Sequence, residues 1–162
     1  MNNTIQLRQA TPDDHQRLVE VMRYWWDGRD LRAGLLKIFF HHFQQTCLVA
    51  ESGGVLAGFL VGFFSQSNSD EAYIHLAGVA PEYRRQGVAR RLYQKFFSIC
   101  LDNDRTVVTS CTSPVNRSSI AYHQCMGFAL LEGDGKVDGF PVSTDYLRPN
   151  DPKVLFRLKL TE

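Results

Sequence analysis

The sequence has little net charge and no long apolar segment. Its 18 Lys and Arg residues nearly balance 17 Asp and Glu residues, which leaves a formal charge of +1. The N-terminal residues Met1–Thr4 contain neither a basic nor an apolar stretch, so they do not resemble a secretion signal. The longest apolar run, Val55–Phe64, is too short to cross a bilayer. We therefore expect a cytoplasmic protein with no membrane partner and, without a basic excess, no nucleic acid partner.

The cysteines also lack a pattern that would suggest a metal site or a disulfide framework. Cys47, Cys100, Cys111 and Cys125 include no C-x-x-C pair. Short-spaced pairs are typical of zinc sites, and disulfide frameworks are typical of secreted proteins. The sequence therefore predicts four free thiols and no metal site.

What the sequence does contain is typical of one globular domain over residues 1–162. Hydrophobic residues make up 44% and charged residues 22% of the chain, which is ordinary globular usage. Alternation and helical spacing predict a mixed α/β sheet with helices on its faces. The expected strands cover 4–8, 47–51, 55–64, 72–80, 106–112, 128–132 and 154–160. The expected helices cover the segment from the N-cap Thr11 to Asp27, then 31–43, 87–101 and 116–126, and residues 133–152 form a long loop.

The segment between the strand at 72–80 and the helix at 87–101 is the most informative. It is rich in arginine (Arg84, Arg85, Arg90 and Arg91) and contains the small residues Gly87 and Ala89. The first turn of a helix exposes unpaired N–H groups, which bind phosphate readily. No Gly-Lys-Ser/Thr follows, and only one glycine is present, so neither a P-loop nor a dinucleotide fingerprint is formed. The alternative interpretation is a solvated basic helix start.

Two motifs in this sequence resemble those of the GNAT family of N-acetyltransferases. Arg84-x-x-Gly87-x-Ala89 resembles the Q/R-x-x-G-x-G/A acetyl-CoA motif, and the segment from Asn116 to Phe128 is similar to the N-x-x-A/S-I…Y-x-x-x-G-F signature. The resemblance implies a mostly antiparallel sheet of about seven strands with helices on both faces. It also implies that strands four and five, at 72–80 and 106–112, are parallel and splay apart. The implied cofactor is acetyl-CoA, bound by Val79, Arg84, Arg85, Gln86, Gly87, Val88, Ala89, Arg90, Asn116 and Ser119.

Two histidines are the candidate catalytic residues. The resemblance puts His123 where the family usually has the tyrosine that protonates the leaving thiolate, and Tyr122 lies about 100° away around the helix. His75 precedes Val79 by four residues, so we expect both on one face of the strand, where His75 could accept a proton from the amine. Glu71 is a weaker candidate base. Either histidine could instead be a packed, hydrogen-bonded core residue.

The acceptor site is the least defined part of the prediction. The candidates are Trp25, Trp26, Asp27, Tyr73 and Tyr146, since aromatic rings and carboxylates suit an ammonium group. Acids in the long loop (Asp134, Asp138 and Asp145) could also attract a cationic amine. The alternatives are that Trp25 is core, that Trp26 is half-buried, and that the loop acids only provide solubility.

The expected function is transfer of an acetyl group from acetyl-CoA to the primary amine of a small molecule, by direct attack in a ternary complex. Two alternatives stay open: a non-catalytic CoA-binding domain, and an acetyltransferase for protein N-termini or lysines. Homodimers are common in the family, so a homodimer stays open as well.

Overall fold

The computed structural model describes residues 4–26 and 28–161. The strands are β1 (Gln6–Gln9), β2 (Cys47–Ser52), β3 (Val55–Phe64), β4 (Glu71–Val79), β5 (Val107–Thr112), β6 (Ala129–Leu130), β7 (Gly135–Val137), β8 (Phe140–Val142) and β9 (Val154–Lys159). Seven of them form one sheet in the order β1-β2-β3-β4-β5-β9-β6, while β7 and β8 form a separate hairpin. The mixed sheet of seven strands is therefore confirmed.

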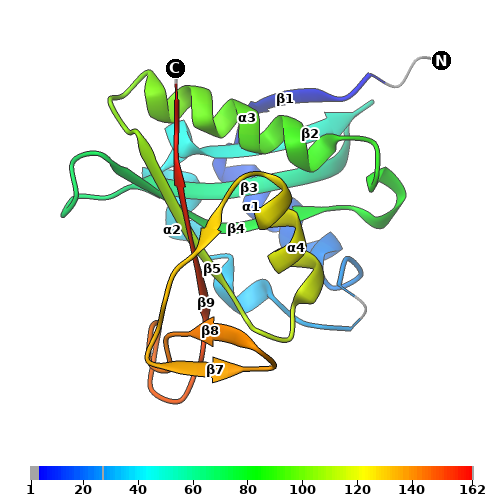
Figure 1. Cartoon of the computed structure of the whole chain (residues 1–162). Helices are drawn as coiled ribbons and strands as arrows, with labels where there is room; N and C mark the ends of the chain where they lie inside the picture. The colour runs from blue at the N-terminus through cyan, green and yellow to red at the C-terminus, as the bar shows by residue number, and fades with distance from the viewer. Residues whose placement is uncertain (1–3, 27, 162) are drawn as a thin grey trace.

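Helices cover both faces of this sheet. They are α1 (Pro12–Met22), α2 (Lys37–His42), α3 (Val88–Leu101) and α4 (Arg117–Cys125), with short 3-10 turns η1 (Arg32–Gly34), η2 (Gln44–Thr46) and η3 (Pro81–Tyr83). In Figure 1, α3 and α4 lie in front of the sheet, and α1 and α2 lie behind it. None of the helices in the described ranges is long and apolar enough to span a membrane.

Strands β4 and β5 are parallel, whereas the other strand pairs in the described sheet are antiparallel. Pairing between β4 and β5 begins where Glu71 pairs with Val107 and ends where Ile74 pairs with Ser110. Beyond Ile74 the five remaining residues of β4 have no partner in β5. The predicted splay between these strands is confirmed, and it opens the middle of the sheet.

Two apolar cores hold the helices in place. On one face, Phe96 of α3 and Phe156 of β9 are completely buried, and on the other face Phe40 of α2 packs with Phe59 of β3. Burying a side chain of this size stabilises the fold by about 1.5–3 kcal/mol. This packing holds α3 against one face of the sheet and α2 against the other.

The predicted helix over 31–43 is broken, which is a correction. The structure has η1 and then α2, with Leu35 and Leu36 in non-helical conformations between them. The Gly34 carbonyl accepts a hydrogen bond from His75 Nε2 at 2.7 Å, and the Leu35 carbonyl accepts one from His15 Nε2 at 2.8 Å. Two carbonyls that would extend a helix bind side chains from other elements instead.

The predicted loop over 133–152 contains the β7–β8 hairpin, which is a second correction. Asp138 and Gly139 connect the two strands with φ values of 51° and 85°. Two positive φ angles in a two-residue connection match the Asp-Gly hairpin turn, which the sequence carries. The other predicted strands and helices overlap their observed counterparts.

Candidate active site at the splayed strands

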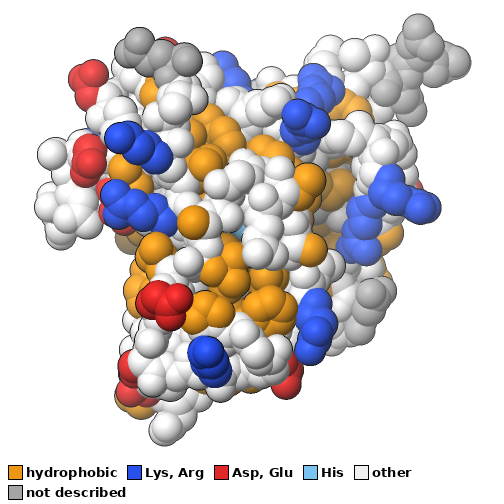
Figure 2. Space-filling model, viewed as in Figure 1, with side chains coloured by type: hydrophobic (Ala, Val, Ile, Leu, Met, Phe, Trp, Pro, Cys, Tyr) orange, Lys and Arg blue, Asp and Glu red, His pale blue; other side chains and the backbone are white. Residues whose placement is uncertain are grey.

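Two cavities meet where β4 and β5 separate. The first, of about 380 Å³, lies beside the arginine-rich turn and includes Arg84 and Ala89, so we call it the turn cavity. The second, of about 350 Å³, is lined by the 29–34 segment and by the loop before β9, so we call it the loop cavity. The two cavities share Trp26, Arg29, Ala77, Tyr93, Asn116, Ser119 and His123. On the face drawn in Figure 2, apolar surface runs through the middle of the molecule with Lys and Arg side chains around it.

The turn before α3 has the geometry of an anion site. Arg85 and Gly87 adopt positive φ angles of 60° and 77°, and Gly87 occupies the N-cap position of α3 without a side chain to cap it. Among the described residues, no acceptor pairs with the backbone N–H groups of residues 85–90. A Cβ at Gly87 would meet no protein atom within 4 Å, so the space beside it is open. Unpaired N–H groups beside open space favour a bound anion.

The end of β4 presents backbone groups to the gap. The Ala80 N–H bonds to the Ala57 carbonyl of β3, and peptide groups alternate in direction along a strand, so those of Val79 and Ala77 point away from β3. The Val79 carbonyl accepts a 3.3 Å hydrogen bond from Arg84 Nε, and a second Arg84 nitrogen bonds to the Trp25 carbonyl. Arg84 therefore links the end of β4 to the segment after α1.

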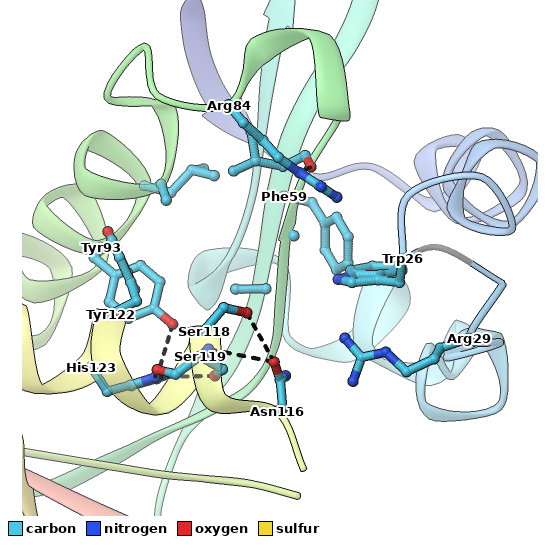
Figure 3. A pocket seen from close by; sticks show the side chains of 15 residues that line it. Trp26, Arg29, Phe59, Arg84, Tyr93, Asn116, Ser118, Ser119, Tyr122 and His123 are labelled. Carbon is cyan, nitrogen blue, oxygen red and sulfur yellow. Dashed lines mark hydrogen bonds between the residues drawn. The ribbon is translucent and has the colours of Figure 1, made fainter.

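Asn116 is the N-cap of α4 and lines both cavities. Its Oδ1 accepts a hydrogen bond from the Ser119 N–H at 3.4 Å, and its Nδ2 donates to Thr112 Oγ1 at 3.3 Å. Figure 3 shows Asn116 between the start of α4 and Arg29. Of the predicted cofactor residues, those that line the turn cavity are Val79, Arg84, Ala89, Asn116 and Ser119. Arg85, Gln86, Gly87, Val88 and Arg90 belong to the adjacent turn and the start of α3.

His123 is buried at the junction of the two cavities and is paired with Tyr93 of α3. Its Nδ1 lies 2.8 Å from the Ser119 carbonyl, which accepts only from an N–H, so Nε2 is left to accept from the Tyr93 hydroxyl at 3.1 Å. The ring stacks on Phe156 with centroids 4.3 Å apart. Burial lowers the pKa of His123, partly offset by the Ser119 hydrogen bond, and burial raises the pKa of Tyr93. His123 is thus a neutral imidazole near pH 7.

Tyr122 lines the turn cavity beside His123 but does not share its hydrogen bonds. Its hydroxyl is buried and has no partner among the described residues. Burial is the main cause that raises the pKa of Tyr122 to about 12. The hydroxyl that His123 does bind comes from Tyr93, which the sequence interpretation missed because no motif marks it.

His75 lies on the other side of β4 from Val79, which corrects the predicted shared face. Ile74 and Leu76 pair with the neighbouring β3 residues Gly62 and Val61, so His75 is an extra residue in a β-bulge. The bulge reverses the alternation: Val79 packs toward the core under α3, whereas the His75 ring stacks on Phe39 of α2 at 4.8 Å. His75 therefore lines the loop cavity.

The predicted acceptor residues that the structure describes separate into three groups. Trp26 lines both cavities and lies directly over Gly78, where a Cβ would come within 2.5 Å of the indole. Trp25 is a core residue, 4% exposed. Tyr73 donates a 3.2 Å hydrogen bond to Cys111, a wall residue of the loop cavity, but Tyr73 and Tyr146 are not among the described residues that line it. Asp27 lies outside the described residues.

The acids of the long loop have local structural roles. Asp134 accepts hydrogen bonds from the Thr144 N–H and hydroxyl, and Asp145 accepts one from the Asn150 N–H. Asp138 forms the hairpin turn. None of the three belongs to the described lining of either cavity, so a role in attracting an amine stays a prediction that the geometry does not test.

Comparison with known proteins agrees with this architecture. The sequence profile of the Acetyltransferase (GNAT) family matches residues 5–128. The chain belongs to the GNAT family. The L-2,4-diaminobutyric acid acetyltransferase of Vibrio cholerae serotype O1 is 31% identical over 124 residues, which are 74% of this chain and 69% of that relative. For three other relatives of the same name, the match covers only 41–45% of the relative's length.

Solved structures show the same GNAT fold. Ard1 from Thermoplasma volcanium has a TM-score of 0.78 at 20% identity, covering 98% of this chain and 99% of that one. Diaminobutyrate acetyltransferase EctA from Paenibacillus lautus, in complex with its substrate L-2,4-diaminobutyric acid and coenzyme A, has a TM-score of 0.70 at 22% identity, covering 98% and 96%.

The turn cavity fits the cofactor that GNAT membership implies. A pyrophosphate needs several N–H donors and space for close approach, and both are present at residues 85–90 beside the open side of Gly87. An extended amide arm needs peptide groups that face it, and those of Ala77 and Val79 point into the gap, with the Val79 carbonyl also accepting from Arg84 Nε.

Proposed function

We propose that this GNAT protein is an acetyl-CoA-dependent N-acetyltransferase that acts on the primary amine of a small molecule. The observation that carries the proposal is the junction of the turn and loop cavities. Because seven residues line both, a cofactor in one cavity and an amine in the other can be bound together and can touch. The amine then attacks the thioester directly, with no covalent enzyme intermediate.

The cofactor is proposed to enter through the turn cavity. The N–H groups of residues 85–90 bind its pyrophosphate, and the peptide groups of Val79 and Ala77 bind its pantetheine arm. Arg84 and Asn116 flank the arm from two sides. When bound, acetyl-CoA supplies an activated acyl thioester; the residues around it hold its carbonyl near the donors of β4.

His75 is proposed to accept the proton of the attacking amine. The Gly34 carbonyl accepts a hydrogen bond from the His75 Nε2–H, so the lone pair of His75 Nδ1 is free to accept a proton. Nδ1 has no hydrogen-bond partner among the described residues. Phe39 stacks on the ring and the bulge holds its backbone, so the base is kept in one orientation inside the loop cavity.

His123 is proposed to act through Tyr93. Since Nδ1 donates to the Ser119 carbonyl, Nε2 holds the Tyr93 hydroxyl at the junction. Tyr93 lines both cavities, so rotation of its O–H bond away from His123 Nε2 would direct the hydrogen toward the leaving thiolate, as a proton donor requires. His123 is then a positioning residue rather than the donor itself.

The relatives named for L-2,4-diaminobutyric acid suggest that compound as the first acceptor to offer. Trp26 is the proposed wall against which the acceptor packs, because it belongs to both cavities. Tyr73 acts indirectly, through the hydrogen bond that it donates to Cys111 in the cavity wall.

The test has two stages. Thermal unfolding with acetyl-CoA at about 100 times its Kd should raise the midpoint by about 5–11 °C, whereas ATP at the same concentration should not. Thiol release is then measured with a panel of small amines and with peptides that have free N-termini or lysines. Cofactor binding without transfer to any acceptor, or transfer to peptides alone, would overturn the small-amine proposal.

A further inference from the structure

The loop cavity carries more positive than negative charge, which is unexpected for a site that takes a cationic amine. The charged residues that line it are Arg29, Asp30, Arg148 and Lys153. Asp30 is already neutralised by Arg32, whose Nη2 lies 2.6 Å from Asp30 Oδ2. The carboxylate that accompanies the remaining cations is that of Asp151, beside the cavity.

Arg148 and Lys153 share this single carboxylate. Arg148 Nε lies 2.9 Å from Asp151 Oδ2, and Lys153 Nζ lies 2.6 Å from Asp151 Oδ1. The Lys153 side chain is only 14% exposed, so its charge is screened less by solvent than that of a surface lysine. This cluster therefore leaves one positive charge at the wall formed by the loop before β9.

Arg29 supplies the second uncompensated charge. It lines both cavities, and its guanidinium makes no ion pair with any described residue. Figure 3 shows this guanidinium turned toward Asn116 and below Trp26, beside the junction. A planar guanidinium with no ion-pair partner in the described part of the chain is suited to bidentate binding of a carboxylate.

We propose that the acceptor is an amino acid, whose carboxylate is bound by Arg29 in the positive field of the Arg148–Asp151–Lys153 cluster. The inference rests on the proposed function and deepens it. A simple amine or polyamine would bring only positive charge into a positive cavity, whereas a carboxylate compensates it. Because Arg29 also lines the turn cavity, the carboxylate lies a short distance from the reacting amine, which favours a free amino acid over a long peptide.

The experiment compares acceptors that differ only in the carboxylate. The pairs are L-2,4-diaminobutyrate with 1,3-diaminopropane, L-ornithine with 1,4-diaminobutane, and L-lysine with 1,5-diaminopentane. For each pair, kcat/KM is measured by thiol release in the wild type, in Arg29→Gln and in Arg157→Gln. Arg157 is an exposed arginine of β9 outside both cavities, so its variant is the matched control for loss of one charge.

In the wild type and in Arg157→Gln, kcat/KM should be about tenfold or more higher for the amino acid than for the diamine of at least one pair. In Arg29→Gln this preference should fall by about the same factor, which corresponds to one charge-assisted hydrogen bond. The loss should fall on the KM of the acceptor and not on that of acetyl-CoA. Equal use of both members of every pair, or a preference that survives in Arg29→Gln, overturns the inference and leaves the acetyltransferase proposal intact. Stabilisation by acetyl-CoA with no transfer to any amine overturns both.

Discussion

The turn cavity and the loop cavity are built by different means. The turn cavity uses the backbone: N–H groups at the start of α3, peptide groups at the end of β4, and a glycine that leaves room. The loop cavity uses side chains from segments that are far apart in the sequence, such as Arg29 before η1 and Lys153 before β9. Binding by backbone groups tolerates many different side chains, so the turn cavity can keep the same ligand when its sequence changes. The loop cavity depends on a few individual side chains for its specificity.

The largest effect is expected when the open space at Gly87, in the turn beside the turn cavity, is filled. Gly87→Val should abolish stabilisation by acetyl-CoA, because the added side chain occupies open space in front of the α3 N–H groups. Thermal unfolding with and without acetyl-CoA measures it.

Gly54→Val is the matched control, since Gly54 has a similar φ of 81° and equally open space, but lies in the β2–β3 turn. Both variants pay the cost of a positive φ, about 1–2 kcal/mol. Full stabilisation of Gly87→Val by acetyl-CoA would show that the turn does not bind the pyrophosphate.

A change in the loop cavity should affect the chemical step rather than cofactor binding. His75→Gln should lower kcat by about 10²–10⁴-fold, the usual contribution of a general base, and leave the KM for acetyl-CoA unchanged. The kcat and the KM for acetyl-CoA are the measurements.

His15→Gln is the matched control for His75→Gln. His15 also binds a carbonyl of the 34–35 segment, but it does not line either cavity among the described residues. If both variants lose kcat equally, His75 only holds the segment in place.

Asn116 lines both cavities and caps α4, so replacing it should cause a modest loss of both fold stability and cofactor affinity. Asn116→Ala removes the N-cap of α4 and should cost about 1 kcal/mol of unfolding free energy. It should weaken acetyl-CoA binding by about 1 kcal/mol, the value of one ordinary hydrogen bond. Denaturant unfolding and equilibrium binding measure the two effects, and a loss of stability with unchanged affinity would remove Asn116 from the cofactor site.

The smallest effect concerns the junction itself. Because burial lowers the pKa of His123, the unfolded chain takes up a proton that the folded chain resists. The contribution of His123 to stability is therefore full above its unfolded value near 6.5 and declines as the pH falls below it. His123→Gln should show a shallower decline than the wild type. Identical slopes in the two proteins would contradict the buried neutral pair with Tyr93.

The difference between the two cavities also explains which parts of the site could be predicted from the sequence. The basic turn, Gly87 and the Asn116 cap are local features with short motifs, so the turn was predictable, and the family resemblance that these motifs carry implied the splayed sheet. The hairpin also had a local signal in Asp138-Gly139, which was overlooked. The β4 bulge was not predictable, because it depends on the register with β3. Arg29 and Tyr93 carry no motif; only packing of α3, α4 and the 29–34 segment around the gap brings them to the site.

The central claim is that cofactor and acceptor occupy the two cavities at the same time. The most direct measurement is the initial rate of acetyl transfer with both substrates varied. We predict intersecting double-reciprocal lines, as direct attack in a ternary complex requires, and no acetylated enzyme by mass spectrometry after incubation with acetyl-CoA alone. Parallel lines together with a trapped acetyl-enzyme would contradict the account, because the acetyl group would then pass through the protein and the two cavities would not need to meet.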